Sequence, residues 1–250
     1  MSDTILITGA GRGIGLALTR ELLNKGHRVI ATCRHLDSGD ALRQMSQEKT
    51  GLLDVQPLDI TNDESVALLA RHVEQVHGKL DVLVNNAAVF IDRHNTSIAN
   101  LDLRQLVTTF ETNVVGVARI TQALMACLSR SNRPRIINLS SGAGLISTKR
   151  NSKYYAYSIS KAALNMFVRM LEMEARQKSI CVVAVTPGRV QTDMGDHDAP
   201  LTAPECAQSL AGMIEELQIT DTGRFLDRNG QPCFAEVFKD ASGRVCSVGW

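Results

Sequence analysis

The sequence predicts an α/β fold of the Rossmann type, with a doubly wound parallel sheet flanked by helices in a single domain. Three observations favour this class. Short apolar runs alternate with helical patterns, these runs are apolar on both faces, and a glycine-rich segment follows the first of them. The 250 residues fit one large α/β domain or two small ones. Because no repeat or linker divides them, we assign one domain to residues 1–250.

The expected strands are short runs rich in β-branched and aliphatic residues, which suit a parallel sheet that is buried on both faces. They are, in chain order, TILIT (4–8), RVIATC (28–33), DVLVNNA (81–87), RIINLS (135–140), ICVVAVTPG (180–188) and GRFLD (223–227). Another short apolar run precedes Pro57.

The expected helices lie between these runs and have apolar residues at helical spacing. Two of them begin with a capping box, in which a Thr is followed three residues later by Glu. Thr61 with Glu64 shows this pattern, as does Thr202 with Glu205, where Pro204 also suits a first turn. The expected helical ranges are 16–26, 61–78, 103–128, 157–176 and one opened by Thr202.

The composition argues against several classes of protein. The net charge of +1 offers no basis for binding nucleic acid or an acidic membrane, and no apolar run approaches the ~20 residues of a membrane-spanning helix. The first residues lack the basic region and cleavage site of a signal peptide. Neither the six cysteines nor the six histidines show metal-ligand spacing. We therefore expect a cytoplasmic protein without a metal site.

The segment TGAGRGIG (8–15) follows the first strand and opens the first helix. In such a loop the glycines permit a tight turn, close approach to a pyrophosphate and close packing of helix on sheet, while the helix N-terminus offers free N–H groups to phosphate. The alternative is a plain glycine-rich turn. The dinucleotide contacts expected from this loop are Gly9, Gly11, Arg12, Gly13, Ile14 and Gly15.

The end of the second strand indicates which dinucleotide binds. An NAD site has an acidic residue there for the ribose 2′-hydroxyl, whereas an NADP site needs positive charge for the 2′-phosphate. Cys33 stands where the acid is expected, Arg34 follows it, and Arg12 can reach the same phosphate. The sequence therefore predicts NADP(H) as cofactor. The alternative for Arg34 is a solvated surface arginine.

Asp59 and Ile60 follow the apolar run that ends near Pro57. A carboxylate at the carboxyl end of a strand can accept a hydrogen bond from the adenine amino group, and Ile60 can cover the adenine ring. The spacing supports equally well a second interpretation, in which Asp59 caps the following helix.

All three tyrosines lie in KYYAYSISKAALN (153–165). On a helix, residues i and i+4 share one face, so Tyr157 alone has a lysine, Lys161, one turn away. A neighbouring ammonium stabilises a phenolate and lowers the pKa of the phenol, which suits Tyr157 for proton transfer. Tyr154 and Tyr155 are expected to pack or to line the pocket.

With TGAGRGIG (8–15), NNAA (85–88), Asn113, Ser141 and YSISK (157–161) in this order, the chain resembles the short-chain dehydrogenase/reductase family, classical type. The resemblance runs from about residue 4 to residue 194. Within the family, the YYAY segment, the loop before it and the TDMG stretch resemble those of sniffer-type carbonyl reductases and C-factor-like proteins.

The resemblance implies a catalytic set. Tyr157 would donate a proton, Lys161 would assist it and bind the nicotinamide ribose, Ser141 would orient the carbonyl group, and Asn113 would hold a water for proton relay. The further cofactor contacts that it implies are Asn85, Asn86 and Ala87 near the adenosine ribose, and Pro187, Gly188, Val190 and Thr192 near the nicotinamide.

Some assignments in this set stay open. Ser140 and Ser147 compete with Ser141, although Ser140 should face the other side of the sheet if the strand continues. The alternative interpretation of Asn113 is an ordinary buried asparagine in a helix. The chain departs from the family pattern in two places: Ala88 replaces the usual glycine of NNAG, and the loop between Ser141 and Tyr157 is longer than is common.

The expected function is NADPH-dependent reduction of a small-molecule carbonyl substrate such as an aldehyde, ketone or dicarbonyl. A 3-oxoacyl reductase is an alternative, because Lys149, Arg150 and Lys153 would suit an acidic acyl carrier. A cofactor-binding sensor with little turnover is another alternative.

Loops 142–152 and 191–204 are the expected substrate walls. The apolar residues of helix 157–176 predict a homodimer or homotetramer, unless the tail 229–250 covers them.

Overall fold

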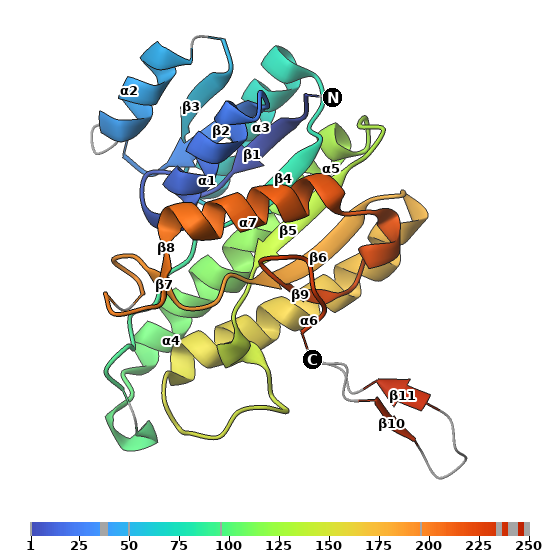
Figure 1. Ribbon diagram of the computed structural model, residues 1–250. Helices are drawn as coiled ribbons and strands as arrows, with labels where there is room; N and C mark the ends of the chain where they lie inside the picture. The colour runs from blue at the N-terminus through green and yellow to red at the C-terminus, as the bar shows by residue number, and fades with distance from the viewer. Residues whose placement is uncertain are drawn as a thin grey trace.

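Seven parallel strands form one sheet in the order β3-β2-β1-β4-β5-β6-β9 (Figure 1). The computed structural model describes residues 2–35, 40–49, 51–95, 97–195, 197–233, 237–239 and 245–247. All six expected strands are present, and the run before Pro57 forms a seventh. The strands are β1 (Thr4–Ile7), β2 (Arg28–Cys33), β3 (Leu53–Pro57), β4 (Val82–Asn85), β5 (Arg135–Leu139), β6 (Cys181–Thr186) and β9 (Phe225–Asp227). The strand order reverses between β1 and β4, so a crevice opens there at the carboxyl ends.

Helices cover both faces of this sheet (Figure 1). They are α1 (Gly13–Asn24), α2 (Asp40–Glu48), α3 (Asp63–His72), α4 (Leu103–Phe110), α5 (Val117–Leu128), α6 (Tyr155–Gln177) and α7 (Ala203–Glu216). Buried residues of α1, α2 and α7 pack on one face, and those of α3, α5 and α6 on the other. In β1, Ile5 and Ile7 face the first layer and Leu6 the second, and all three are fully buried.

Two π-helical turns interrupt the regular helices. The helix expected over 103–128 is present as α4 and α5 joined by such a turn, Glu111–Gly116, and a second turn, Val73–His77, continues α3. A π turn accommodates one more residue than an α turn and so rotates the side chains that follow it. Both turns therefore place polar side chains where regular α-helical spacing would not.

The start of α3 differs from the prediction. Its capping residue is Asn62 and not Thr61, because the Asn62 side chain accepts a hydrogen bond from the backbone N–H of Ser65 at 2.8 Å. Thr61 instead donates its hydroxyl to Asp59 at 2.7 Å. The expected capping box at the start of α7 is confirmed.

The substrate loop 191–204 and the tail are described in part. A short parallel pair, β7 (Val190–Gln191) and β8 (Leu201–Thr202), brackets the loop, in which Asp196 lies outside the described residues. Within the tail, β10 (Val237–Lys239) and β11 (Val245–Ser247) form an antiparallel pair, while residues 234–236, 240–244 and 248–250 lie outside the described part. No helix in the described ranges has the length and apolarity that crossing a membrane requires.

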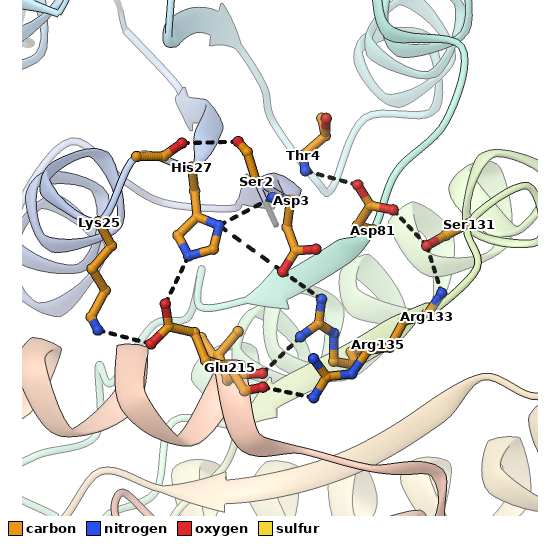
Figure 2. Close-up of polar contacts among 12 residues, drawn as sticks. Ser2, Asp3, Thr4, Lys25, His27, Asp81, Ser131, Arg133, Arg135 and Glu215 are labelled. Atoms are coloured by element: carbon orange, nitrogen blue, oxygen red, sulfur yellow. Dashed lines mark hydrogen bonds and ion pairs between the residues drawn. The ribbon is translucent and has the colours of Figure 1, made fainter.

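A polar network joins the amino ends of the central strands (Figure 2). Arg135, at the start of β5, is fully buried and donates to the Asp3 carboxylate at 2.6 Å and to the Ile214 carbonyl at 2.9 Å. The Asp81 carboxylate accepts from the backbone N–H of Thr4 at 2.9 Å and from the hydroxyl of Ser131 at 2.6 Å. These bonds pair the buried charges, although Nε of Arg135 has no partner among the described residues, and they tie the strands together at the end of the sheet away from the crevice.

This network makes the fold sensitive to acid. Burial raises the pKa of Asp81, but its hydrogen bonds with Ser131, Thr4 and Lys79, together with the charge of Lys79, outweigh burial, so the pKa lies below its ordinary value. A carboxyl whose pKa is lowered in the folded state stabilises the fold above its unfolded pKa and loses that contribution as pH falls. We expect the free energy of unfolding, measured with urea, to fall as pH drops below about 4. The Asp81→Asn variant should show a shallower fall, and an unchanged slope would contradict this role.

Candidate active site

A cleft with a volume of about 830 Å³ lies at the carboxyl ends of the strands. Loops that follow β1, β2, β3, β4 and β6 meet there with α6. Among the predicted site residues, Gly15, Asn85, Asn113, Ser141, Gly188 and Val190 lie outside the lining of this cleft as the described residues define it. The predicted site residues that line it are Gly9, Gly11, Arg12, Gly13, Ile14, Arg34, Asp59, Ile60, Asn86, Ala87, Tyr157, Lys161, Pro187 and Thr192.

The glycine loop needs glycine for steric reasons. Gly9 has φ +68°, and a Cβ there would lie 2.9 Å from the Cα of Ala87. A Cβ on Gly15 would lie 2.5 Å from the carbonyl oxygen of Gly9. Asn86 fastens the loop to β4, since its amide nitrogen donates to the carbonyl oxygens of Thr8 at 2.8 Å and Gly9 at 2.9 Å. The backbone can therefore approach a ligand at this point without an intervening side chain.

The N-terminus of α1 opens towards the same loop. Within the described part of the chain, the N-cap residue Arg12 makes no side-chain capping bond, and the first turn carries no acidic residue. The free N–H groups and the positive end of the helix dipole suit a phosphate group. The Arg12 guanidinium is exposed and lies 2.9 Å from the Asp193 carboxylate.

Where the loops after β2 and β3 line the cleft, Arg34 is exposed beside Asp59. The hydrogen bond from the Thr61 hydroxyl lowers the pKa of Asp59, burial raises it, and the charge of Arg34 lowers it further. One Asp59 oxygen also accepts from the backbone N–H of Thr61 at 2.9 Å. Asp59 therefore both faces the cleft and stabilises the turn before α3. Burial raises the pKa of the Cys33 thiol, so this residue carries no charge at neutral pH.

Tyr157 and Lys161 lie one turn apart on α6, as their spacing predicted. The Lys161 ammonium lies 5.6 Å from the centre of the Tyr157 ring and donates to the carbonyl oxygen of Leu139 at 2.7 Å. The Tyr157 hydroxyl hydrogen-bonds with Ser141, which follows β5. Lys161 from the same helix and Ser141 from the end of β5 thus converge on one phenol.

Burial controls the acidity of these groups. It raises the pKa of Tyr157 to about 12, and the hydrogen bond with Ser141 lowers it only in part. Burial also lowers the pKa of Lys161 from 10.5 to about 8. The sequence predicted a lowered pKa for Tyr157 because of the neighbouring ammonium. In the protein alone, the loss of hydration of both groups outweighs their attraction.

The competing serines are placed differently from Ser141. Ser140 lines the cleft, but it is buried and its hydroxyl donates to the Asn165 amide oxygen of α6 at 2.5 Å. The strand β5 ends at Leu139, so the expected alternation of faces does not extend to Ser140. Ser147 is exposed in the following loop. Of these three serines, Ser141 alone bonds to Tyr157 among the described contacts.

Asn113 lies in the π turn between α4 and α5 and is fully buried. Its side-chain oxygen accepts from the backbone N–H of Val89 at 2.8 Å, and its nitrogen donates to the Val89 carbonyl at 2.9 Å and to the Ser160 hydroxyl at 3.0 Å. The amide thus joins the loop after β4 to α6, and the water-relay role stays a prediction. Asn85 is also buried and donates to Asn138 of β5 at 2.9 Å.

The sequence analysis missed two residues that hold Tyr157 in place. Phe90 stacks on the Tyr157 ring with a centroid distance of 4.3 Å, and Tyr154 meets Phe90 edge-on at 5.0 Å. Asp92 is buried, and its carboxylate accepts from the backbone N–H groups of Ala156 at 2.7 Å and Tyr157 at 3.3 Å. Asp92 therefore caps the N-terminus of α6 from a distant loop, for which the sequence has no local signal.

We expect Asp92→Ala to lower both stability and turnover. Loss of a helix cap costs roughly 0.5–2 kcal/mol, and here it also frees the turn that carries Tyr157. Urea unfolding and kcat, measured below the melting temperature, should both fall. Asp92→Asn keeps an oxygen acceptor and should recover most of kcat. If Asp92→Ala lost stability but kept its kcat, the cap would have no part in positioning Tyr157.

Comparison with known proteins agrees with this geometry. The sequence matches the family model for short chain dehydrogenase over residues 3–200. It is 35% identical over 153 residues to the C-signal protein of Myxococcus xanthus, covering 61% of this chain and 91% of that protein.

Two solved carbonyl reductases share the fold. The carbonyl reductase Sniffer of D. melanogaster superposes with a TM-score of 0.88 at 29% identity, covering 93% of this chain and 99% of that one. The NADPH-bound carbonyl reductase from chicken fatty liver has a TM-score of 0.86 at 30% identity, covering 93% and 98%. The chain belongs to the short-chain dehydrogenase family of oxidoreductases.

Proposed function

We propose that this protein is an NADPH-dependent carbonyl reductase that acts on aldehydes, ketones or dicarbonyls. The observation that carries the proposal is the convergence of Ser141, Tyr157 and Lys161 beside the glycine loop. A phenol, a hydroxyl and an ammonium in this arrangement can bind a carbonyl oxygen and protonate it.

The cleft contains groups that match each part of a dinucleotide. The N-terminus of α1 and the Gly9 turn suit the pyrophosphate. Arg34 and Arg12 supply positive charge for a 2′-phosphate, and Lys161 can donate to ribose hydroxyls. The bound cofactor would supply the hydride. This chain's residues would orient the acceptor, exclude water and supply the proton.

The raised pKa of Tyr157 suits the reducing direction. A phenol with a pKa of about 12 is protonated at neutral pH, so it has a proton to donate. As the proton leaves, the Lys161 ammonium stabilises the phenolate that forms. The Ser141 hydroxyl can donate to the oxygen on which negative charge develops, which lowers the energy of the transition state.

The walls of the cleft favour a small apolar substrate. Met194 of loop 191–204 and Val89 of the loop after β4 line the cleft. The 3-oxoacyl alternative relied on basic residues in the second loop. Lys149 turns inward, since its ammonium donates to the Ser158 hydroxyl at 2.8 Å and burial lowers its pKa. This leaves Arg150 and Lys153 exposed for an acidic partner.

The test is NADPH oxidation with a panel of aldehydes, ketones, diketones and 3-oxoacyl thioesters. We expect turnover with members of the first three groups. Preference for thioester-linked 3-oxoacyl chains would favour the 3-oxoacyl reductase. NADPH binding without turnover on any substrate would favour the sensor, and a search for a protein partner would follow.

We also propose that two copies associate through α4 and α6. These neighbouring helices expose Leu103, Val107, Met166, Met170 and Met173, each by more than half of its surface. Exposed apolar side chains on two neighbouring helices favour burial against a second copy. A monomeric mass in sedimentation at micromolar concentration would contradict this assembly.

A further inference from the structure

Three side chains with metal-binding atoms converge at the edge of the sheet, away from the cleft. They are Asp54 near the amino end of β3, His72 at the end of α3 and His77 in the π turn that follows. One Asp54 oxygen lies 2.7 Å from Nε2 of His72 and 2.9 Å from Nε2 of His77. A candidate ligand atom from each of the three residues lies within 4.8 Å of the other two.

The π turn brings the two histidines together. On a regular α-helix, residues five apart differ by about 140° around the axis, so their side chains point away from each other. The wider π turn Val73–His77 places the i+5 residue close to the i residue, and the two imidazole rings lie 6.0 Å apart. This explains why the sequence spacing gave no indication of a histidine cluster.

The surroundings orient the potential ligands. The other Asp54 oxygen accepts from the Gln56 side chain at 2.6 Å, which directs the remaining oxygen towards the histidines. The side chain of His77 is only 5% exposed, and its Nδ1 has no hydrogen-bond partner among the described residues. In this structure Nε2 of His77 donates to the Asp54 carboxylate. Because Nδ1 has no partner among the described residues, the ring proton can move to Nδ1, which leaves a lone pair on Nε2 for a metal ion.

A surface hollow of about 450 Å³ adjoins the three residues. Leu52 and Val76 contribute to its lining. The volume of this hollow leaves room for a further ligand from solvent. Arg28 also lines it, so an anion or a water suits that position better than a second cation. The residues at the end of α3 face the negative end of the helix dipole, which favours positive charge there.

We propose that Asp54, His72 and His77 bind one divalent transition-metal ion, with Zn²⁺ as the best match, and that a solvent ligand completes its coordination. Two imidazoles and a carboxylate are a donor set that Zn²⁺ accepts in tetrahedral geometry. Ligand atoms around such an ion lie roughly 3.4 Å apart. The present contacts of 2.7 and 2.9 Å must therefore open by about 0.7 Å at His72 and about 0.5 Å at His77. The His72 side chain is 30% exposed and can move by this amount.

The ion would join the edge strand β3 to the end of α3. It touches none of the residues that line the cleft, so its expected effect is on stability and not on the chemical step. Binding to the folded state alone raises the melting temperature in proportion to the logarithm of metal concentration above the dissociation constant.

Isothermal titration of the full chain with ZnCl₂, after treatment with a chelator, tests the site. We expect one ion per chain with micromolar or tighter affinity, together with a rise in melting temperature. His72→Gln and Asp54→Asn should each weaken binding at least tenfold, or about 1.4 kcal/mol. His197→Gln changes an exposed histidine elsewhere and should leave binding unchanged.

The absorption spectrum of the Co²⁺-substituted protein gives a second readout that does not depend on the variants' stability. Tetrahedral nitrogen and oxygen ligands give visible bands, whereas cysteine ligands add a thiolate charge-transfer band in the near ultraviolet. The proposal is overturned by any of three results. They are no binding at millimolar Zn²⁺, binding that His72→Gln leaves unchanged, and a thiolate band that identifies cysteine ligands.

Discussion

Replacement of Tyr157 by phenylalanine is expected to lower kcat for carbonyl reduction by about 10³-fold, because a positioned general acid contributes roughly 10²–10⁴. The substitution removes the hydroxyl that bonds to Ser141 and keeps the ring that stacks on Phe90 at 4.3 Å. Fold and cofactor affinity should therefore survive. The measurement is steady-state NADPH oxidation with the best substrate of the panel, together with a cofactor-binding titration on the same preparation.

The two neighbouring tyrosines serve as matched controls. Tyr154→Phe and Tyr155→Phe make the same chemical change within three residues of Tyr157. Tyr154 contacts Phe90 through its ring, which phenylalanine keeps, so both controls should retain most of the activity. If Tyr157→Phe kept its kcat while either control lost it, the proton donor would be another residue. If no variant changed the biological role of the protein, the sensor alternative would gain support.

Cofactor preference should depend on Arg34. We expect the protein to bind NADPH at least about tenfold more tightly than NADH, or ~1.4 kcal/mol. Arg34→Leu should weaken NADPH binding by about 10- to 100-fold, because a hydrogen bond to a charged group contributes roughly 1.5–3 kcal/mol. NADH binding should change little, since its adenosine ribose carries no 2′-phosphate. Fluorescence titration with both dinucleotides measures each affinity.

A double variant should gain affinity for NADH. Cys33→Asp with Arg34→Leu places a carboxylate at the end of β2, where it can accept from both ribose hydroxyls of NADH. Arg12→Leu tests the second cation, and its effect should be smaller because Arg12 already pairs with Asp193 at 2.9 Å. Equal affinity of the native protein for NADPH and NADH would refute the assignment of Arg34 to the 2′-phosphate.

The elements predicted best from the sequence are those that have a local cause. Buried parallel strands require continuous apolar runs, and all six predicted strands lie in the sheet. The capping box of α7 and the long helix over 103–128 are likewise local patterns. The helix α2 was not expected, because it is mostly polar and only Leu42 and Met45 of its described side chains are buried.

The active site could be predicted in part for the same reason. The glycine loop and the Tyr157–Lys161 pair each lie within one short segment. The spacing of their residues in the sequence therefore fixes how these residues are arranged in space. Three contacts could not be inferred in this way. They are the cap that Asp92 provides to α6, the stack of Phe90 on Tyr157, and the hydrogen bonds between Asn113 and Val89. Each depends on a contact between segments that are distant in the sequence.

The sequence by itself determined the strands, most helices, the glycine loop and the Tyr157–Lys161 pair. The tertiary structure alone decided which residues converge: Ser141 on Tyr157, Asp92 on the start of α6, and the pair His72 and His77 on Asp54. Local structure follows from side-chain periodicity and capping, which neighbouring residues specify. Convergence depends on how helices and loops pack on the sheet, and on π turns that shift the helical repeat, and neither is encoded in any single short segment.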